Sequence, residues 1–433
     1  MEIKKLIEES YLLRRAYVSD DVVRALDNLK KYSNVKSRDF LFPSGKEYNG
    51  WMVPKKWDVK EAKILRNGRI VYDGLKHPLG VITNSSSFVG KVSKKKLVEH
   101  LHFAPNRPDA IPYHFRLQYR PWESDWGFCV PKTLYNSLKP GTYEVVLKTT
   151  LIKGVMVSRE FILAGKSKYT IIFVAHVDHP GQANDDLTGC AVGIALLNEL
   201  AKRYRKPRYT YKLLLTQEIL GSVFYLHTMK KQELTALTYG LFLEMLGNKN
   251  TLHLQKSLLG DTYIDRVAML ALRKFRNPRI SDFRESAGND EIVFEAPGIE
   301  IPMPSISRWP YPEYHTSDDN LKIIHESKLQ ESVKYLLEMV FILEHDWVLT
   351  RIFDGLVSLA NPKYDLYVDP GQIIGGGLHK NKALEGFQYQ MPRYLTGKYA
   401  ISDLAAIFEI DFGWLVDYFK NMEKKKLVSL SGI

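Results

Sequence analysis

Between residues 155 and 345 the sequence alternates between short segments that are apolar along their whole length and longer segments with helical spacing. The apolar segments are "YTIIFVA" (169–175), "YKLLLT" (211–216) and "YGLFLEML" (239–246), and the helical ones between them are "GCAVGIALLNELAKRY" (189–204) and "SVFYLHTMKKQEL" (222–234). Strands without a polar face are buried on both sides, as in parallel or mixed sheets covered by helices. Sites in such sheets form beyond the carboxyl ends of the strands. We therefore expect an α/β domain with its site at that edge.

The flanks of this α/β segment, 155–349, have a different character, and 433 residues are too many for one ordinary domain. Residues 1–36 are expected to be helical, since "DDVVRALDNLKKY" places apolar side chains on one helix face. Residues 37–154 are rich in Gly, Pro and aromatics, and the short runs "RIVYDG", "LGVIT", "WGFCV" and "YEVVLKTTLI" indicate an inserted β-rich domain. Residues 350–433 begin irregularly and end in two amphipathic helices joined by a tight turn, which resembles a winged-helix domain.

The net charge of +12 could indicate a nucleic-acid partner, but the basic residues are scattered and form only short runs such as "KVSKKK" and "EKKK". The second C-terminal helix offers Lys420 and Asn421 but also Asp417 and Glu423, a poor face for reading DNA bases. We expect a solvated lysine-rich surface, and a structural or protein-contact role for the winged helix.

Two features favour a cytoplasmic protein. Only two cysteines occur, so no disulfide framework is expected. The N-terminal sequence lacks the apolar block of a secretory signal, and no apolar stretch approaches the roughly 20 residues of a membrane span.

Each strong strand of the α/β segment is followed by a residue that can bind metal or move a proton. These residues are His176, Asp178, Asp185 and Asp186 after the first strand, Glu218 after the second, Glu244 after the third, and His315 in the later segment "YPEYHTSDDN". Taken singly, Asp185 and Asp186 are better explained as helix N-caps, and His176 as an ordinary histidine at a strand end. Carboxylates flanked by long apolar runs, however, seldom lack a charged or metal partner. Together the residues predict a metal site.

The order of these motifs resembles the two-zinc exopeptidase family, which includes bacterial aminopeptidases, glutamate carboxypeptidase and glutaminyl cyclase. The resemblance is carried by His-x-Asp, Asp-Asp-x-Thr-Gly, a Glu after the next strand, "LEMLG", "GNDEIVFEAPGIEIP" and Tyr-His-Thr-x-x-Asp, within 155–325. A closer resemblance, to aminopeptidase-like proteins often associated with polysaccharide biosynthesis, is carried by "PSGKEYNGWMVPKKWDV", "HLHFAPNRPDAIPYHFRLQY", "PGQANDDLTG" and "RWPYPEYHTSDDN". It implies a zinc-exopeptidase-like mixed sheet flanked by helices, an inserted β-rich domain and a C-terminal winged helix, with 1–36 as the N-terminal part of the peptidase domain.

The resemblance implies specific roles. His176, Asp185, Glu244 and His315 would be metal ligands, with Asp185 shared by two ions; Asp178 would orient His176, and Glu218 would be the general base acting on water. Zinc suits imidazole and carboxylate ligands, although Mn²⁺ and Co²⁺ bind the same donors, and one or two ions per chain are expected.

One departure from the family pattern lies at Gln217-Glu218-Ile219, where the family has adjacent Glu-Glu, base then ligand. Counting back from Gly221 makes Glu218 the base and puts Ile219 in place of the second ligand. Pairing Gln217-Glu218 with Glu-Glu instead makes Glu218 the ligand and removes the base. We favour the first alignment, which leaves one ion poorly held.

Four further residues are weaker candidates for contact with substrate. His179 is expected to line the pocket or to substitute as a ligand, and Arg308, Tyr311 and Tyr314 to bind a substrate carboxylate or oxyanion. A turn or loop role is at least as good an explanation for each of the four.

The sequence therefore favours a cytoplasmic zinc-dependent aminopeptidase-type hydrolase that cleaves an N-terminal residue or related small amide from a short substrate. Its expected partners are a short peptide or small amide, with a homo-oligomer left open and neither nucleic acid nor a membrane favoured. The alternatives are a catalytically weak or inactive metal- or peptide-binding protein and, less favoured, a winged-helix DNA-binding regulator.

Overall fold

The computed structural model describes residues 2–367, 373–374, 377–378 and 382–432, and these form two compact units. One unit comprises Met1–Ile264 with Arg276–Lys334, and the other Asp265–Phe275 with Tyr335–Ile433. Helices α9 (Tyr263–Leu272) and α11 (Glu326–His345) contribute residues to both units. The domain boundaries given above stay predictions, and part of the irregular segment after residue 350 lies outside the described residues.

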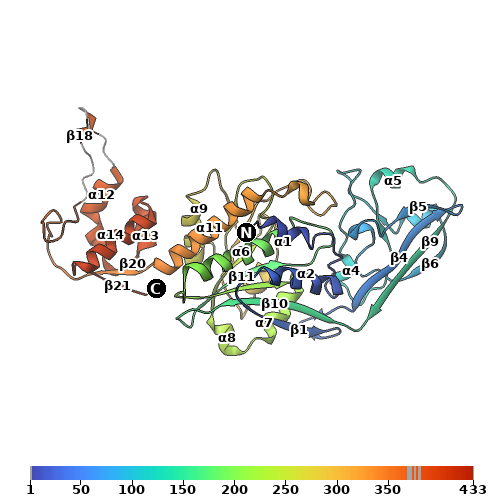
Figure 1. The fold of residues 1–433 in the computed structure, drawn as a ribbon, viewed down its shortest axis with the longest axis horizontal. Helices are drawn as coiled ribbons and strands as arrows, with labels where there is room; N and C mark the ends of the chain where they lie inside the picture. The colour runs from blue at the N-terminus through green and yellow to red at the C-terminus, as the bar shows by residue number, and fades with distance from the viewer. Residues whose placement is uncertain (1, 368–372, 375–376, 379–381, 433) are drawn as a thin grey trace. The chain divides into compact units, whose positions relative to one another are not determined.

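An eight-stranded mixed sheet forms the centre of the first unit (Figure 1). Its strands, in spatial order, are β1 (Lys36–Pro43), β10 (Val155–Leu163), β12 (Thr210–Thr216), β11 (Thr170–His176), β13 (Leu237–Leu243), β16 (Ser305–Ser307), β14 (His253–Gln255) and β15 (Arg279–Ser281). Strands β12, β11, β13 and β16 run parallel, while β10 is antiparallel to both of its neighbours, β1 and β12. The predicted α/β fold with a mixed sheet is confirmed.

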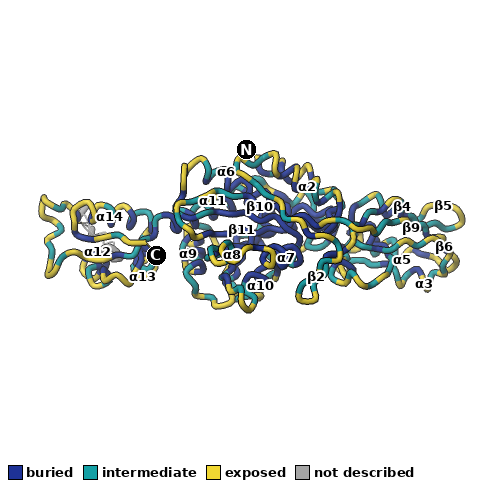
Figure 2. Tube along the Cα trace, turned by 90° about the horizontal axis from the view of Figure 1, so that it is seen from below, coloured by how far each residue is buried: buried dark blue, intermediate teal, exposed yellow. Residues whose placement is uncertain are grey.

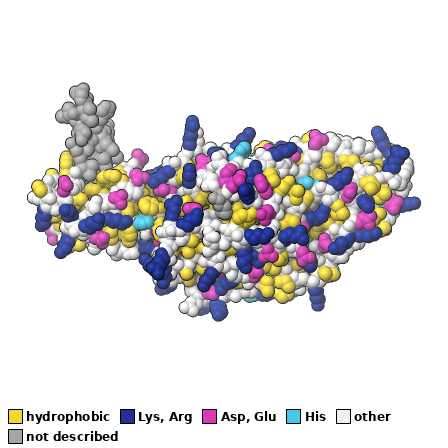
Figure 3. All heavy atoms as spheres, in the orientation of Figure 1, with side chains coloured by type: hydrophobic (Ala, Val, Ile, Leu, Met, Phe, Trp, Pro, Cys, Tyr) yellow, Lys and Arg dark blue, Asp and Glu magenta, His cyan; other side chains and the backbone are white. Residues whose placement is uncertain are grey.

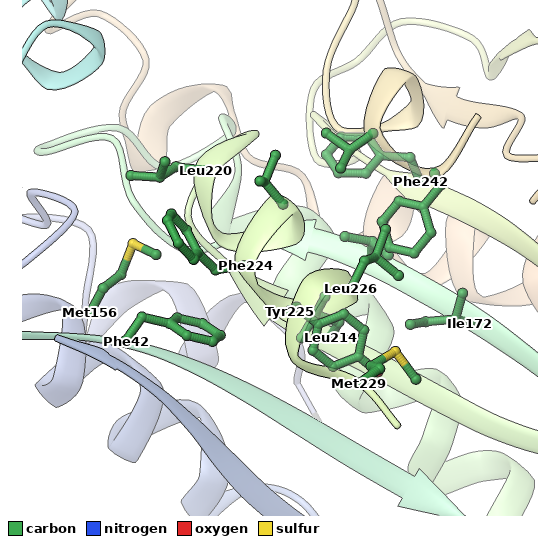
Figure 4. Packing of buried hydrophobic residues seen from close by; sticks show 14 of the residues in the cluster. Phe42, Met156, Ile172, Leu214, Leu220, Phe224, Tyr225, Leu226, Met229 and Phe242 are labelled. Atoms are coloured by element: carbon green, nitrogen blue, oxygen red, sulfur yellow. The ribbon is translucent and has the colours of Figure 1, made fainter. Parts of the chain in front are cut away.

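Helices cover both faces of this sheet, as its apolar strands require. On one side lie α6 (Leu187–Arg203), α1 (Lys4–Glu8) and α2 (Asp20–Lys31), and on the other α7 (Leu220–Thr228), α8 (Lys231–Ala236) and α10 (Glu291–Phe294), which face the viewer in Figure 2. Successive residues of β12 point to opposite faces. Leu213 lies against Gly193 of α6, where an added β-carbon would approach the Leu213 side chain to 2.5 Å, so a larger residue there would require Leu213 to shift. Leu214 instead packs with α7 in the cluster of Figure 4.

The sequence segment 222–234 is helical but not continuous. Helix α7 ends at Thr228 and α8 begins at Lys231, with extended backbone at Met229 and Lys230 between them. Phe224 and Leu226 of α7 join Phe42, Ile172 and neighbouring apolar residues in one buried cluster (Figure 4).

A smaller four-stranded antiparallel sheet lies within the inserted segment. It is formed by β5 (Arg69–Asp73), β4 (Lys56–Arg66), β9 (Thr142–Ile152) and β6 (Phe88–Ser93), in that order. Burial alternates along β4, so one face packs on its own apolar cluster. The same segment holds β2 (Glu47–Tyr48), β3 (Trp51–Met52), β7 (Leu101–His102), β8 (Phe128–Cys129), α3 (Lys94–Val98), α4 (Arg116–Tyr119), α5 (Lys132–Ser137) and the 3₁₀ turn Pro78–Gly80.

Two details differ from the sequence expectation. The run "LGVIT" is not a strand: Pro78 has no N–H to donate, the chain turns as a 3₁₀ helix, and Val81 makes only an isolated bridge to Phe128. Residues 37–43 were expected within the β-rich insertion and Lys36 within the preceding helical part, but together they form β1, which pairs with β10 along the edge of the large sheet.

In the second unit, a three-stranded sheet orders β20 (Thr396–Ala400), β17 (Val348–Arg351) and β21 (Val428–Ser431). Helices α13 (Ile401–Phe408) and α14 (Phe412–Lys424) follow β20, separated by Glu409–Asp411, as the two predicted amphipathic helices. The unit also contains α12 (Lys382–Gln390), the 3₁₀ turn Met391–Arg393 and the pair β18 (Ile373–Ile374) and β19 (Gly377–Leu378). A further 3₁₀ turn, Leu321–Ile323, lies in the first unit.

Two surface properties bear on partners. On the face shown in Figure 3, Lys and Arg side chains are interspersed with Asp and Glu. Among the described helices, none has both the length and the apolar character needed to cross a bilayer.

Candidate metal centre

The candidate site lies at the carboxyl ends of three adjacent parallel strands, the edge predicted from the sequence. His176 is the last residue of β11, Glu218 follows β12 by two residues, and Glu244 directly follows β13. Because β11 pairs in parallel with both β12 and β13, the three ends meet at one edge of the sheet.

The carboxylate of Asp185 is the centre of this cluster. Its Oδ1 lies 3.0 Å from Nε2 of His176, while its Oδ2 lies 3.0 Å from Nδ1 of His179 and 3.2 Å from Nε2 of His315. The His179 ring is 4.4 Å from that of His176 and 5.3 Å from that of His315, between centroids. Three imidazoles thus face one buried carboxylate.

Several donor atoms here are buried without a hydrogen-bond partner among the described residues. They are Nδ1 and Nε2 of His176, Nε2 of His315, Oδ2 of Asp178 and Oε1 of Glu244. Buried polar atoms are nearly always hydrogen-bonded, and a cluster of unsatisfied nitrogen and carboxylate donors is what a divalent cation requires. The residues present therefore fit a zinc-type ion.

Charge coupling within the cluster shifts the protonation equilibria. Burial opposes ionisation of Asp185, but His179, His176 and His315 outweigh it and hold the pKa of that carboxyl well below its usual range. Burial likewise opposes the charged form of His179, yet Asp185 and Asp178 raise the pKa of its imidazole to about 10. Without a cation the His179 imidazole therefore holds a proton at neutral pH, which a metal ion binding at that ring must displace.

Asp178 faces the opposite side of His176. Its Oδ1 lies 3.4 Å from Nδ1 of His176 and accepts a hydrogen bond from the backbone N–H of Glu218 at 2.9 Å. A carboxylate at the second ring nitrogen fixes the orientation of a ligating histidine, which is the role predicted for Asp178. The neighbouring Asp186 is an N-cap of α6, where its Oδ1 accepts from the N–H of Gly189.

Glu218 pairs with His179 through the ring nitrogen that Asp185 does not face. Glu218 Oε2 lies 2.7 Å from Nε2 of His179. Its side chain is 17% exposed, whereas those of Asp178 and Asp185 are exposed by at most 2%. Glu218 is thus the carboxylate of the three with most access to solvent and substrate.

Glu244 is buried at the end of β13, where its Oε2 accepts a hydrogen bond from Nδ2 of Asn289 at 2.9 Å. Burial and the nearby Glu291 raise the pKa of its carboxyl well above the usual range. Two groups of described residues have ligand atoms within 4.8 Å of one another, namely His176, His179 and Asp185, and Asp178, His179 and Glu218. Glu244 belongs to neither group.

The three remaining substrate candidates differ in placement. Arg308 is fully buried and donates to the carbonyl oxygens of Leu246, Asn250 and Lys328. Its guanidinium therefore connects the segment 246–250 to helix α11. Tyr314 stacks on the ring of His315 at 3.8 Å between centroids. Tyr311 donates its hydroxyl to Asp319 at 2.7 Å. Arg308 is not brought to the histidine cluster, and we assign it no contact with substrate.

Sequence reasoning assigned no role to Asp319, although it is the last residue of the Tyr-His-Thr-x-x-Asp motif. Its Oδ1 accepts from the N–H groups of Ala183 and Asn184, and its Oδ2 from that of Asp185 at 3.2 Å. Burial raises the pKa of Asp319 to about 7. Asp319 thus holds the backbone that presents Asp185.

The inserted segment also contributes aromatic side chains to this edge. The N–H of Tyr113 donates to the carbonyl oxygen of His315 at 2.8 Å, and Ile111 pairs with Ser317 through backbone and side chain. The Tyr113 ring lies 4.7 Å from that of His179 and 5.2 Å from that of His315. The inserted segment therefore lines one side of the histidine cluster.

The sequence is similar to one family model and to a relative with an aminopeptidase-like description. The family model described as "Domain of unknown function (DUF4910)" matches residues 4–346. A relative from Clostridium acetobutylicum, described as "Putative polysaccharide biosynthesis protein with aminopeptidase-like domain", is 28% identical over 383 residues, covering 87% of this chain and 84% of the relative.

Solved structures share the fold. A crystal structure of a "putative peptidase" from Clostridium acetobutylicum superposes with a TM-score of 0.84 at 25% identity, covering 99% of this chain and 96% of the other. A zinc aminopeptidase from Bacillus subtilis superposes with a TM-score of 0.57 at 14% identity, covering 78% and 94%. The predicted resemblance to aminopeptidase-like proteins is confirmed, and the second match shows the fold alone.

Proposed function

The chain belongs to the family described as a domain of unknown function (DUF4910), and on this premise we propose that it is a metal-dependent hydrolase of the aminopeptidase type. It would cleave an N-terminal residue, or a related small amide, from a short substrate. The aminopeptidase-like description of its relative supports the class of reaction.

One observation carries the proposal: the Asp185 carboxylate lies within 3.2 Å of ring nitrogens on His176, His179 and His315. These residues come from positions up to 139 apart in the chain, yet their donor atoms converge at the strand edge where α/β folds place their sites. The metal ligands that we propose are His176, Asp185, Glu244 and His315, and the ion that best suits this donor set is Zn²⁺.

A bound divalent cation would supply Lewis acidity, polarising the scissile carbonyl and making water acidic near neutral pH. The protein's own contribution is proton transfer and orientation. Glu218, the most exposed carboxylate of the cluster, would take a proton from the attacking water and pass it to the leaving amine. Asp178 would hold His176 in one orientation through Nδ1.

A pocket that is partly lined by Ile219, the residue after Glu218, would suit an apolar N-terminal side chain. It has a volume of about 470 Å³, and its lining also includes Val223, Leu226, Ile292 and Ile299, with Tyr48 and Trp51 from the inserted segment. Burial of an apolar side chain there would contribute roughly 1.5–3 kcal/mol to binding. Amino-acid anilides with large apolar side chains are therefore the first substrates to try.

The test is hydrolysis of leucine p-nitroanilide by the full chain with added zinc, comparing the wild type with Glu218→Gln. Loss of a general base lowers kcat by about 10²- to 10⁴-fold, while zinc content is expected to stay the same. Hydrolysis that survives this substitution unchanged would refute Glu218 as the base.

A second candidate is a metal- or peptide-binding protein without hydrolytic activity. The observation that favours it is the 2.7 Å contact between Glu218 and His179, which engages the carboxylate proposed as base. In that case the wild type would bind zinc and apolar peptides but release no nitroaniline, and Glu218→Gln would leave peptide affinity unchanged.

A further inference from the structure

We infer that Asp290 is a positioning residue for Glu218: its carboxylate holds the strained backbone turn at Ile219 that directly follows the proposed base. The inference rests on the proposed function for the role of Glu218, but the turn and the bond that holds it can be tested without hydrolysis. It gives a role to a residue that directly precedes α10 and lies outside the proposed ligand set.

The backbone at Ile219 is strained. Its φ is 60° and its ψ is −59°, and the N–H of Leu220 donates to the carbonyl oxygen of Glu218 at 2.7 Å. These values describe the rare γ-turn in which the central residue has a positive φ. A β-branched side chain makes a positive φ especially unfavourable. The turn therefore persists only because neighbouring groups hold it.

Three side chains bond the backbone of this turn. The N–H of Glu218 donates to Oδ1 of Asp178 at 2.9 Å, and the carbonyl oxygen of Glu218 accepts from the hydroxyl of Tyr17 at 3.1 Å. The N–H of Ile219 donates to Oδ2 of Asp290 at 3.0 Å. Of the three side chains, Asp290 alone bonds the strained residue itself, so its loss is the change that should release the turn.

The Asp290 side chain serves neither as a helix cap nor as an ion-pair partner. It stands at the N-cap position of α10 without a capping bond, and no Lys, Arg or His of the described chain forms an ion pair with it. Asp290 is fully buried, and burial raises the pKa of its carboxyl to about 7, a rise that the bond from Ile219 opposes. What this costly buried carboxyl contributes is an acceptor for the turn.

The direction of the Glu218 carboxylate depends on the same turn. Glu218 Oε2 lies 2.7 Å from Nε2 of His179, within the histidine cluster. A different φ at Ile219 would redirect the chain directly after Glu218 and shift its carboxylate. A shift of about 1 Å in a catalytic group lowers the rate by about 10²-fold.

The first experiment compares kcat, KM and bound zinc in the wild type, Asp290→Ala and Asp290→Asn, with leucine p-nitroanilide as substrate. The Ala variant lacks the acceptor, so kcat is expected to fall by about 10²-fold while bound zinc is unchanged. The Asn variant keeps an oxygen that can accept from Ile219, and it should retain most of the wild-type kcat. Asp346→Ala is the matched control, since Asp346 is equally buried and accepts from the N–H of Ser402 at 2.9 Å. Its kcat should equal that of the wild type.

Glycine at position 219 separates support of the turn from general stability. Glycine adopts a positive φ without strain. Asp290→Ala should therefore lower kcat at least about 10-fold less in the Ile219→Gly background than in the wild type. Because Ile219 also lines the apolar pocket, kcat rather than KM is compared.

Equal losses of kcat in the two backgrounds, or a wild-type kcat in Asp290→Ala, would overturn the inference. Should Asp290→Ala fail to fold, Ile219→Gly is compared with the double variant Ile219→Gly/Asp290→Ala. Equal kcat of these two supports the inference, and a difference of about 10²-fold overturns it.

Failure of the proposed function is distinguishable from failure of this inference, because crystal structures report the turn directly. The φ at Ile219 should become negative in Asp290→Ala and stay positive in the wild type and in Asp346→Ala. This change of φ, in a protein that hydrolyses no anilide, would refute the hydrolase but support Asp290 as the residue that holds the turn. Hydrolysis that needs Glu218 but not Asp290, with φ still positive in Asp290→Ala, would support the hydrolase and refute the inference.

Discussion

Arg15 donates from Nε to the carbonyl oxygen of Val177 at 2.8 Å, joining the N-terminal helices to the loop that carries the candidate ligands. The same guanidinium bonds the carbonyl oxygens of His179 and Gln182 in that loop, and those of Ser10 and Tyr11 in its own segment. Arg15 is fully buried, and burial lowers the pKa of its guanidinium to about 10. The arginine therefore fixes the backbone on which His176, His179 and Asp185 converge.

Replacing Arg15 by Met should destabilise the protein and loosen its metal centre. The substitution leaves several buried carbonyl groups without donors, each at a cost of about 1–3 kcal/mol, so unfolding free energy should fall by at least about 3 kcal/mol. Urea denaturation with zinc analysis measures both effects. The matched control is Arg24→Met, since the Arg24 side chain is 62% exposed and its ion pair contributes less than about 1 kcal/mol. Equal stability of the two variants would contradict the role of Arg15.

The sequence predicted the parts of the fold that follow from local pattern. The wholly apolar run at 169–175 became a buried strand, β11, and the Asp-Asp pair before Leu187 became the start of α6. Both outcomes depend on short-range features, namely apolar strand length and helix capping. Because parallel strands end at one edge, the same pattern predicted where the polar residues would gather.

Arg15 could not be predicted in this way. In "YLLRRAYV" it looks like one of two surface arginines, and Arg14 beside it is only partly buried. Its acceptors in the loop that carries the candidate ligands are backbone carbonyls more than 160 residues away, which carry no side-chain signature. The role of Asp319 was hidden for the same reason, because it bonds the backbone N–H groups of the Asp185 loop.

The position of Glu244 shows the limit of motif spacing. The spacing put it in the ligand set, and the structure places it at the right strand end but bonded to Asn289. The motif spacing predicts at which strand end Glu244 lies. The direction of its side chain depends instead on Asn289, a partner 45 positions later in the sequence. Its role as ligand stays a prediction.

The pocket beside Ile219 predicts selectivity for large apolar side chains. Ala296→Trp should fill this pocket from its partly exposed rim, whereas Ala296→Ser leaves its volume nearly unchanged. The ratio of kcat/KM for leucine over alanine p-nitroanilide should fall at least about 10-fold in the Trp variant, since steric loss of apolar burial is worth about 1–3 kcal/mol. An unchanged ratio would place the substrate side chain elsewhere.

The ion pair between Arg159 and Asp39 predicts a pH-dependent contribution to stability. Arg159 bonds Asp39 through Nε at 2.6 Å, which lowers the pKa of the Asp39 carboxyl. A lowered carboxyl pKa stabilises the folded state above about pH 4, the unfolded value, and this stabilisation is lost as pH falls through the folded pKa. Because the Asp39 side chain is 38% exposed, the contribution is about 1 kcal/mol or less.

Asp39→Asn should therefore lower the thermal midpoint at pH 7, and the difference from wild type should shrink as the pH is taken below 4. Differential scanning calorimetry across that range measures it, with Asp354→Asn as the control at an exposed carboxylate. A difference that persists undiminished at low pH would show that charge is not its source.

Asp185 and Asp186 give the most direct test of the metal centre, because adjacent and equally buried carboxylates have different surroundings. Asp185 faces three imidazoles, and Asn in its place keeps the shape but loses the charge and one oxygen donor. Asp186 caps α6 through a bond to Gly189, a role that Asn fills as well. Asp185→Asn should weaken zinc binding by at least about 100-fold, since loss of even an outer carboxylate costs about 10- to 100-fold, while Asp186→Asn should bind zinc like the wild type. Competition titration with a chromogenic chelator measures both affinities; equal affinities would mean that the carboxylate on which the three histidines converge does not hold the ion.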